Sequence, residues 1–272
     1  MDLHTHTTAS DGRLAPADLV SRAHAAGVTV LSVTDHDTIA GADAAESACA
    51  GREIAFVPGI EITAIADGTD VHVLGYFINR HSTTLRDFLD AQRTRRIDRL
   101  RQMVDKLAAL GIELDADAIV APAIDDPQKS AGRPWIARAL IAAGHAVDTN
   151  DAFERYLARG RPAFVPRAGA PPPEVFARIH EAGGIASLAH PGLIGRDEWI
   201  SGFVENGLDA LEAYHSKHDA AATARYLGIA SQLGLAVSGG SDFHGDEAHG
   251  PASPGAVALP AECFQVLKAL VR

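Results

Sequence analysis

The chain has 272 residues, 47% of them hydrophobic, a length that suits one large domain or one domain with an insertion. Its 24 basic and 35 acidic side chains give a formal net charge of −11, which argues against a broad surface for duplex DNA or for a membrane. The two cysteines, Cys49 and Cys263, form no CxxC pair and so indicate neither a thiolate zinc site nor a disulfide framework.

Short β-branched runs alternate with helical stretches in the first third of the chain. The first expected strand starts at Asp2, which leaves no room for a leader, and no apolar run of about 18 residues is present, so we expect a cytoplasmic protein. We also expect no obligate protein partner. Strands are predicted at residues 2–7, 28–34, 54–63 and 71–78, and helices at residues 15–27 and 41–51.

The alternation stops in the middle of the chain and resumes near residue 165. Between residues 82 and 164 the pattern predicts only helices, at residues 84–110, 134–144 and 151–160. We expect this stretch to be a small helical domain that caps a substrate site. Residues 1–81 and 165–272 would together form the main domain, into which the helical domain is inserted.

The last third of the chain again alternates strands and helices. Strands are predicted at residues 183–191, 208–214 and 233–244, and helices at residues 172–184, 197–207 and 219–234. Strands that alternate with helices of this length favour an α/β fold with a parallel sheet, which we expect to close as a barrel.

Nine histidines and carboxylates fall at or beside the ends of these strands. His4 and His6 lie two residues apart on a strand, so their side chains point to the same face. The carboxyl ends of barrel strands converge on one face, where active sites are built. We expect two or three divalent metal ions there, bound by His4, His6, Asp11, His36, Glu61, His72, His190, Asp242 and His244.

The donor types narrow the choice of metal. Imidazole and carboxylate donors without thiolate suit Mn²⁺, Fe²⁺ or Zn²⁺, and we expect Mn²⁺ first. Each motif alone has an ordinary explanation, because Asp11-Gly12 is also a turn signal and His72 between valines also suits a hydrogen-bonded core. The case for a metal centre rests on all nine positions together.

Several motifs in order along the chain resemble those of the PHP (polymerase and histidinol phosphatase) family. They are HTHTTASDG, TDHD, GIEIT, DVHVLGY, LAHPG and GSDFHG, and they span residues 4–244. The resemblance implies a distorted seven-stranded (β/α)7 barrel with a trinuclear metal site that hydrolyses phosphoesters. All nine positions of the family's ligand set are intact in this sequence.

The helical insertion resembles one branch of that family more than others. GRPWIARALIAAG, DAFERYLARGRPAFVPR and LEAYHSKH are similar to 3′,5′-nucleoside bisphosphate phosphatases and short-RNA 5′–3′ exonucleases. This implies hydrolysis of a phosphomonoester of a small nucleotide, or of a short oligoribonucleotide. Where that branch has a histidine two positions after the arginine, this chain has Trp135, which either stacks on a base or packs in the core.

For the chemistry, we expect in-line attack by a metal-bridging hydroxide on phosphorus. The candidate catalytic residues are His36, Asp37 and His215, with the last two as candidates for the general acid. Arg133, just before a helix, and Arg161 are the candidates for binding a second phosphate. Five further arginines on the long helix alternate with aspartates, which favours a solvated, salt-bridged face over an RNA-binding surface: Arg93, Arg95, Arg96, Arg99 and Arg101.

Three other functions remain open from the sequence. Histidinol-phosphate phosphatase, another activity of the family, needs only one phosphate pocket and no site for a base. A non-catalytic metal-dependent nucleotide-binding module is a different class, disfavoured because binding alone needs no activated water. A C–N hydrolase of the amidohydrolase type is disfavoured because no lysine lies in a predicted strand.

Overall fold

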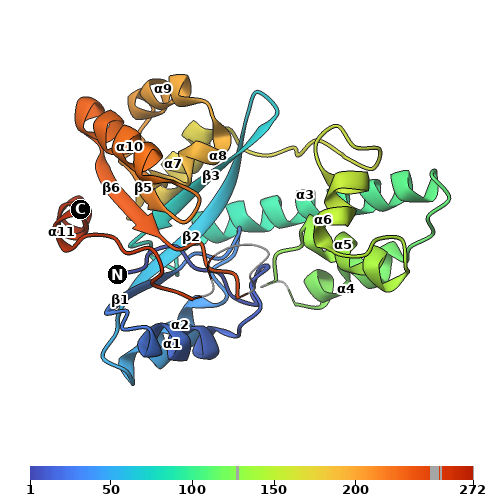
Figure 1. Cartoon of the computed structure of the whole chain (residues 1–272), viewed down its shortest axis with the longest axis horizontal. Coiled ribbons are helices and arrows are strands. Elements are labelled where there is room, and N and C mark those ends of the chain that lie inside the picture. The colour runs from blue at the N-terminus through green and yellow to red at the C-terminus, as the bar shows by residue number, and fades with distance from the viewer. Residues whose placement is uncertain (127–128, 246–250, 252, 272) are drawn as a thin grey trace.

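The computed structural model of the chain describes residues 1–271 except 127–128, 246–250 and 252. Its centre is a curled six-stranded sheet in the order β1-β2-β3-β4-β5-β6 (Figure 1). The strands are β1 (Val30–Val33), β2 (Ala55–Ala66), β3 (Thr69–Tyr76), β4 (Ile185–Leu188), β5 (Ala210–His215) and β6 (Ala236–Gly240). The prediction of an α/β fold with a barrel-like sheet is confirmed.

The N-terminal segment, residues 2–6, lies between the two outer strands. On one side the backbone N–H of Asp2 donates to the Val30 carbonyl of β1 at 2.9 Å, and on the other that of Leu3 donates to the Gly239 carbonyl of β6 at 3.2 Å. The sequence predicts a regular strand at residues 2–7, but this segment forms isolated β-bridges instead. It nevertheless places His4 and His6 inside the closed sheet.

The direction of β3 corrects the expectation of a wholly parallel sheet. β3 runs antiparallel to both β2 and β4, while the other pairs are parallel. Asp67 and Gly68, both with positive φ, join β2 to β3, and a two-residue turn of this kind links only antiparallel strands. As a result, the start of β3 lies beside the end of β2, and His72 pairs with Thr63.

Amphipathic helices cover the outside of the sheet. They are α1 (Pro16–Ala25), α2 (Ala42–Ala50), α7 (Pro172–Glu181), α8 (Pro191–Ile194), α9 (Ile200–Glu205), α10 (Ala220–Leu233) and α11 (Ala261–Ala269), with a 3₁₀ turn at Asp197–Trp199. In α7 the side chains of Val175, Phe176 and Ile179 are buried against the strands, and their i, i+1, i+4 spacing defines one apolar face.

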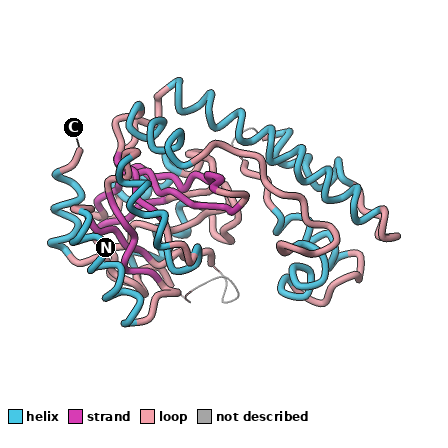
Figure 2. Tube along the Cα trace, turned by 90° about the horizontal axis from the view of Figure 1, so that it is seen from above, coloured by secondary structure: helices cyan, strands magenta, loops and turns pink. Residues whose placement is uncertain are grey.

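The long helix α3 (Thr83–Ala108) connects the barrel with the remaining helices (Figure 2). Its first turns contribute Leu85 and Phe88 to the barrel core, whereas Leu100 and Met103 belong to a separate apolar cluster. That cluster packs α3 against α4 (Ala116–Asp125), α5 (Arg133–Ala142), α6 (Thr149–Ala152) and a π-helical turn at Phe153–Leu157. We therefore keep the proposal that residues 82–164 form a cap on a barrel made of residues 1–81 and 165–272.

One helix differs from the sequence expectation. The helix α4 was not predicted, because Pro122 stands in its interior and normally interrupts a helix. Across the described part of the chain, none of the helices has both the length and the apolar character needed to cross a lipid bilayer.

Candidate metal centre

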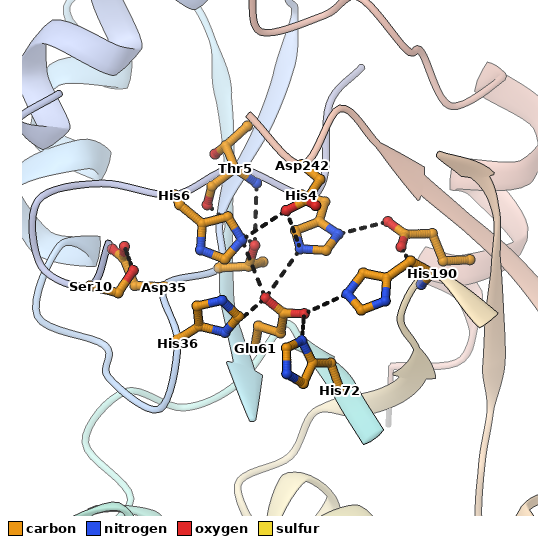
Figure 3. A network of polar contacts seen from close by, with 12 residues as sticks. His4, Thr5, His6, Ser10, Asp35, His36, Glu61, His72, His190 and Asp242 are labelled. Atoms are coloured by element: carbon orange, nitrogen blue, oxygen red, sulfur yellow. Dashed lines mark hydrogen bonds and ion pairs between the residues drawn. The ribbon is translucent and has the colours of Figure 1, made fainter. Parts of the chain in front are cut away.

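Figure 3 shows seven of the nine expected ligands gathered at the carboxylate of Glu61, and the other two, Asp11 and His244, group with His6 and His36. Glu61 lies on β2 with its side chain inside the sheet, and its two oxygens are 2.8–3.3 Å from imidazole nitrogens of five histidines: His4, His6, His36, His72 and His190. Asp242, just after β6, has its Oδ1 atom 3.2 Å from His6 Nε2 and 3.3 Å from His4 Nε2. The predicted strand-end residues therefore form one polar cluster.

The donor atoms in this cluster form four overlapping groups. In each group the atoms lie within 4.8 Å of one another, and the groups are His6–Asp11–His36–His244, His4–His215–Asp242, His4–His6–Glu61 and His36–Glu61–His72. Only His190, of the nine, joins no group, although its Nε2 atom lies 3.0 Å from Glu61. Because His4, His6, His36 and Glu61 each occur in more than one group, the arrangement suits ions that share ligands.

The hydrogen bonding of the cluster fits bound cations. Several of its buried atoms have no hydrogen-bond partner in the described structure: His4 Nε2, both ring nitrogens of His6, His36 Nδ1, His190 Nδ1 and Glu61 Oε2. Buried polar atoms are rarely left unpaired, since this costs about 1–3 kcal/mol each. Imidazole and carboxylate donors of this kind bind divalent metals, so the residues fit a divalent metal centre.

Protonation of the cluster follows from the same contacts. Burial raises the pKa of Glu61, but the imidazoles of His36, His72 and His4 hold it well below its usual value. Burial lowers the pKa of His6, but the carboxylates of Asp242 and Glu61, each 3.2 Å from its Nε2 atom, raise it to about 10. Divalent ions would replace these imidazole protons as partners of the carboxylates, so metal binding will release protons.

Glu212 on β5 is an important residue of the site that the sequence analysis missed. It is fully buried, its Oε1 atom lies 2.9 Å from His4 Nδ1, and its Oε2 accepts the backbone N–H of His190 at 2.7 Å. A proton on Nδ1 of His4 leaves Nε2 free to face the cluster, as in the carboxylate–histidine–metal arrangements of metalloproteins. The signal was present, because a glutamate inside an apolar strand run resembles Glu61.

We predict that Glu212→Gln weakens metal binding by about 10- to 100-fold, because outer carboxylates fix the tautomer and basicity of a histidine ligand. The measurement is competition for Mn²⁺ between the protein and a fluorescent chelator. Glu205→Gln, at the exposed end of α9, is the matched control and should bind metal like the wild type. Equal affinities in all three proteins would contradict the role assigned to Glu212.

Two further buried aspartates hold the segments that carry ligands. Asp35 accepts hydrogen bonds from the backbone and hydroxyl of Thr7, at 2.7 and 2.6 Å, and from the hydroxyl of Ser10 at 2.6 Å. Asp2 accepts the backbone N–H and hydroxyl of Ser241 at 2.9 and 2.6 Å. These bonds fix the loop that presents Asp11 and the turn that presents Asp242.

Backbone conformation at the ligand positions is unusual. Asp37, His190 and Asp242 have φ values of +51°, +27° and +55°, in the left-handed region that residues other than glycine seldom adopt. Asp37 directly follows His36. His190 and Asp242 lie just after the ends of β4 and β6, which face the cluster. Such conformations cost energy and cluster at functional sites, where the surrounding fold enforces them.

The three candidate catalytic residues lie in three different environments in the structure. His36 belongs to two of the donor groups. Asp37 points away from them, because it forms an ion pair with Arg96 and accepts the backbone N–H of Thr63 at 2.8 Å. His215 accepts the backbone N–H of Lys217 at its Nδ1 atom, so a neutral imidazole carries its proton on Nε2, 3.3 Å from Asp242 Oδ2.

The two candidate phosphate-binding arginines, Arg133 and Arg161, differ in burial and in contacts. Arg133 is partly buried at the start of α5, where its guanidinium donates to the Leu157 carbonyl at 3.4 Å and lies over the ring of Phe153. Arg161 is exposed, and its side chain makes no hydrogen bond or ion pair with any described residue. The interpretation of the α3 arginines as a solvated face is wrong for Arg96 and Arg99, which are buried.

Comparison with known proteins gives consistent matches. The model of the PHP domain matches residues 2–128. A 5′-3′ exoribonuclease of Haemophilus influenzae is 36% identical over 253 residues, which cover 89% of each chain. A 3′,5′-nucleoside bisphosphate phosphatase of Chromobacterium violaceum is 33% identical over 249 residues, covering 90% of this chain and 87% of that one.

A solved structure from Bifidobacterium adolescentis, assigned as a metal-dependent phosphoesterase, has the same fold. It superposes with a TM-score of 0.88 at 30% identity and covers 98% of this chain and 95% of that chain. The similarity therefore extends over the barrel and the helical insertion together.

Proposed function

Because this chain belongs to the PHP family and is a metal-dependent hydrolase of phosphoester bonds, we propose that its substrate is a small nucleotide with a second phosphate, such as a nucleoside 3′,5′-bisphosphate. A short 5′-phosphorylated oligoribonucleotide has the same two anionic groups. The observation that carries the proposal is a group of buried and partly buried arginines beside Asp70, a neighbour of His72 on β3. We call Arg96, Arg99, Arg133 and Arg167 the arginine group.

The arginine group lies next to the metal centre by way of strand β3. Asp70 and His72 are two residues apart on β3 and so share a face. Asp70 lies 3.5 Å from the Nε atom of Arg167. Burial raises the pKa of Asp70, but the positive charges of Arg167, His72 and Arg133 lower it overall. Three elements far apart in the sequence thus place positive charge beside a candidate metal ligand.

Positive charge in the arginine group exceeds the negative charge that faces it. Four guanidinium groups are balanced by only two paired carboxylates, Asp37 and Asp70. Burial and, to a smaller extent, the positive charge of Arg96 lower the pKa of Arg167 to about 9. Burial and, to a smaller extent, the positive charge of Arg133 lower the pKa of Arg99 to about 10. An additional anion would relieve this repulsion.

The arginine group also has hydrogen-bond donors to offer. Arg99 Nη2 and Arg167 Nη1 are buried and have no hydrogen-bond partner among the described residues. Guanidinium groups bind phosphate oxygens in a bidentate manner, and paired donors of this kind give both affinity and orientation. We therefore assign the second phosphate to Arg99, Arg133 and Arg167, and leave the exposed Arg161 out of the site.

The metal centre is accessible at His72, beside the arginine group, and also at Asp11. Of the nine expected ligands, Asp11 and His72 have the most exposed side chains, at 24% and 23%. A phosphate can approach between them, past His36, without displacing the buried ligands. Divalent ions bound there would lower the pKa of a water molecule and neutralise charge on the phosphoryl group. Asp37 and His215 then act as positioning residues, Asp37 through Arg96 and His215 through Asp242.

The first test is release of phosphate from adenosine 3′,5′-bisphosphate by the Mn²⁺-loaded protein. We expect release by the wild type and none by His36→Ala, in which one member of two donor groups is lost. Absence of release with the metal content confirmed would overturn the proposal, and histidinol phosphate and short RNA would then be the next substrates.

The arginine group makes a separate prediction about substrate choice. Arg167→Met should raise KM for adenosine 3′,5′-bisphosphate by about tenfold or more, because hydrogen bonds between charged groups contribute about 1.5–3 kcal/mol. KM for adenosine 3′-monophosphate, which has no second phosphate for the arginine group to bind, should change little in comparison. Arg161→Met is the matched control and should behave like the wild type. A larger effect of Arg161→Met than of Arg167→Met would contradict the assignment.

A further inference from the structure

A cavity of about 350 Å³ opens beside the loop that carries Asp11. Its barrel side is formed by Ser10 and Gly12, which flank Asp11, and its other side by α4 and α5. His72 and His36 have ring centroids 5.0 Å apart, and His36 Nε2 is 3.7 Å from Asp11 Oδ2. A series of contacts therefore runs from the arginine group through His72, His36 and Asp11 to the cavity.

Trp135 of α5 forms the aromatic wall of this cavity. Its ring packs against the apolar cluster of the helical cap but remains partly exposed where it lines the cavity, beside Ile119 and Pro122. Trp135 is two residues from Arg133, and side chains at this spacing on a helix point to different faces. The start of α5 thus presents a cation to the arginine group and an indole to the cavity.

Two cations stand beside the indole. Arg138, one turn further along α5, and Lys129 both line the cavity. Neither side chain makes a hydrogen bond or an ion pair with any residue that the structure describes. An aromatic face next to unpaired cations is the arrangement with which proteins bind single-stranded nucleic acid, in which the base stacks and the phosphate pairs with charge.

We propose that this cavity is a subsite for the second nucleotide of an oligonucleotide, whose base stacks on Trp135, while Arg138 and Lys129 bind the phosphate that follows this nucleotide in substrates longer than a dinucleotide. The inference rests on the proposed function, because it takes the arginine group as the site of the 5′-phosphate. The phosphodiester would then lie at the metal centre. A nucleoside bisphosphate has no group to place in the cavity.

The same bond breaks in both kinds of substrate. In the dinucleotide pApA and in adenosine 3′,5′-bisphosphate, a water oxygen bonds to phosphorus, the P–O3′ bond breaks, and a proton passes to O3′. The dinucleotide gives two molecules of adenosine 5′-monophosphate, and the bisphosphate gives adenosine 5′-monophosphate and phosphate. One arrangement of the metal centre therefore serves both, and the cavity adds preference for the longer substrate.

The first arm of the test measures stacking without turnover. The chain has two tryptophans, and Trp199 lies beside Phe203 on the α9 side of the barrel, so Trp199→Phe leaves Trp135 as the only indole fluorophore. In the metal-free full chain, pApA should quench this emission, with half-saturation at a concentration about tenfold lower than for adenosine 3′,5′-bisphosphate, since one stacked base contributes about 1–3 kcal/mol. Unchanged emission with pApA would overturn the proposal.

The second arm compares kinetic constants in the Mn²⁺-loaded enzyme. Trp135→Leu should lower kcat/KM for pApA by about tenfold, chiefly through KM, and leave that for adenosine 3′,5′-bisphosphate unchanged, while Trp135→Phe keeps most of the preference. Equal losses on both substrates would assign Trp135 a structural role and overturn the proposal. If Trp135→Leu does not fold, the absence of any wild-type preference for pApA would overturn it.

The two arms separate this inference from the proposed function. Quenching by pApA with no hydrolysis of any nucleotide would overturn the phosphatase proposal and support the subsite. Hydrolysis of both substrates with neither quenching nor preference would support the phosphatase and overturn the subsite.

Discussion

Glu61→Gln is expected to reduce phosphate release by about 1,000-fold or more, because divalent metals contribute several kcal/mol of charge stabilisation to phosphoryl transfer. Glu61 is the one side chain in contact with five of the histidines in the cluster, at 2.8–3.3 Å. The amide keeps the shape of the carboxylate but removes its charge and one acceptor. The imidazoles would then surround a neutral group.

Metal content distinguishes this explanation from a general loss of structure. We expect Glu61→Gln to retain the far-ultraviolet circular dichroism of the wild type while it binds fewer Mn²⁺ ions per chain, measured by elemental analysis after gel filtration. Glu205→Gln again serves as the surface control. Full metal occupancy together with turnover within tenfold of the wild type would show that Glu61 is not a shared ligand.

Arg96→Met should lower the free energy of unfolding by about 3–5 kcal/mol, the range found when one partner of a buried ion pair is removed. Arg96 is 9% exposed, and its guanidinium pairs with Asp37, donates to the Ala131 carbonyl at 3.1 Å and donates to Thr63 Oγ1 at 3.1 Å. The variant leaves the carboxylate of Asp37 buried without its counter-charge. The loss of unfolding free energy should be measurable in the absence of substrate.

Urea denaturation of a double-mutant cycle tests this prediction. The double variant Arg96→Met/Asp37→Leu should recover a large part of the loss, because an apolar pair often replaces a buried ion pair at little cost. Arg101→Met is the matched control on the same helix, since its pair with Asp117 is exposed and should contribute under about 1 kcal/mol. If Arg101→Met destabilised the protein as much as Arg96→Met, burial of the pair would not be the cause.

Local patterns in the sequence predicted most of the elements. β-branched runs and short amphipathic segments located the strands, because burial on one or both faces leaves a readable period. The predicted parallel direction of β3 was wrong, although Asp67-Gly68, a strong hairpin signal, stands between two expected strands. The alternation of strands and helices elsewhere in the chain favoured a parallel sheet, and the hairpin signal at this one turn is local.

The candidate site was predictable where strand ends define it, and less so where pairing is long-range. The structure brings the nine expected residues together because all lie at one end of the sheet. Glu212 and His4 are 208 residues apart, so their contact has no local pattern. Arg96 and Arg99 looked solvated because acidic residues surround them in sequence, but their i, i+3 spacing turns both to the buried face of α3.

Closure of the sheet by residues 2–6 has a consequence for the order of events during biosynthesis. Ser241 donates to Asp2 across 239 positions of the chain, so Asp2 receives this partner only after the residues of β6 have been synthesised. Contacts of this range also slow folding after release. His4 and His6 therefore lack Glu212 and Asp242 as partners until the last two strands have been synthesised, and metal capture by the complete ligand set will follow, not guide, closure of the barrel.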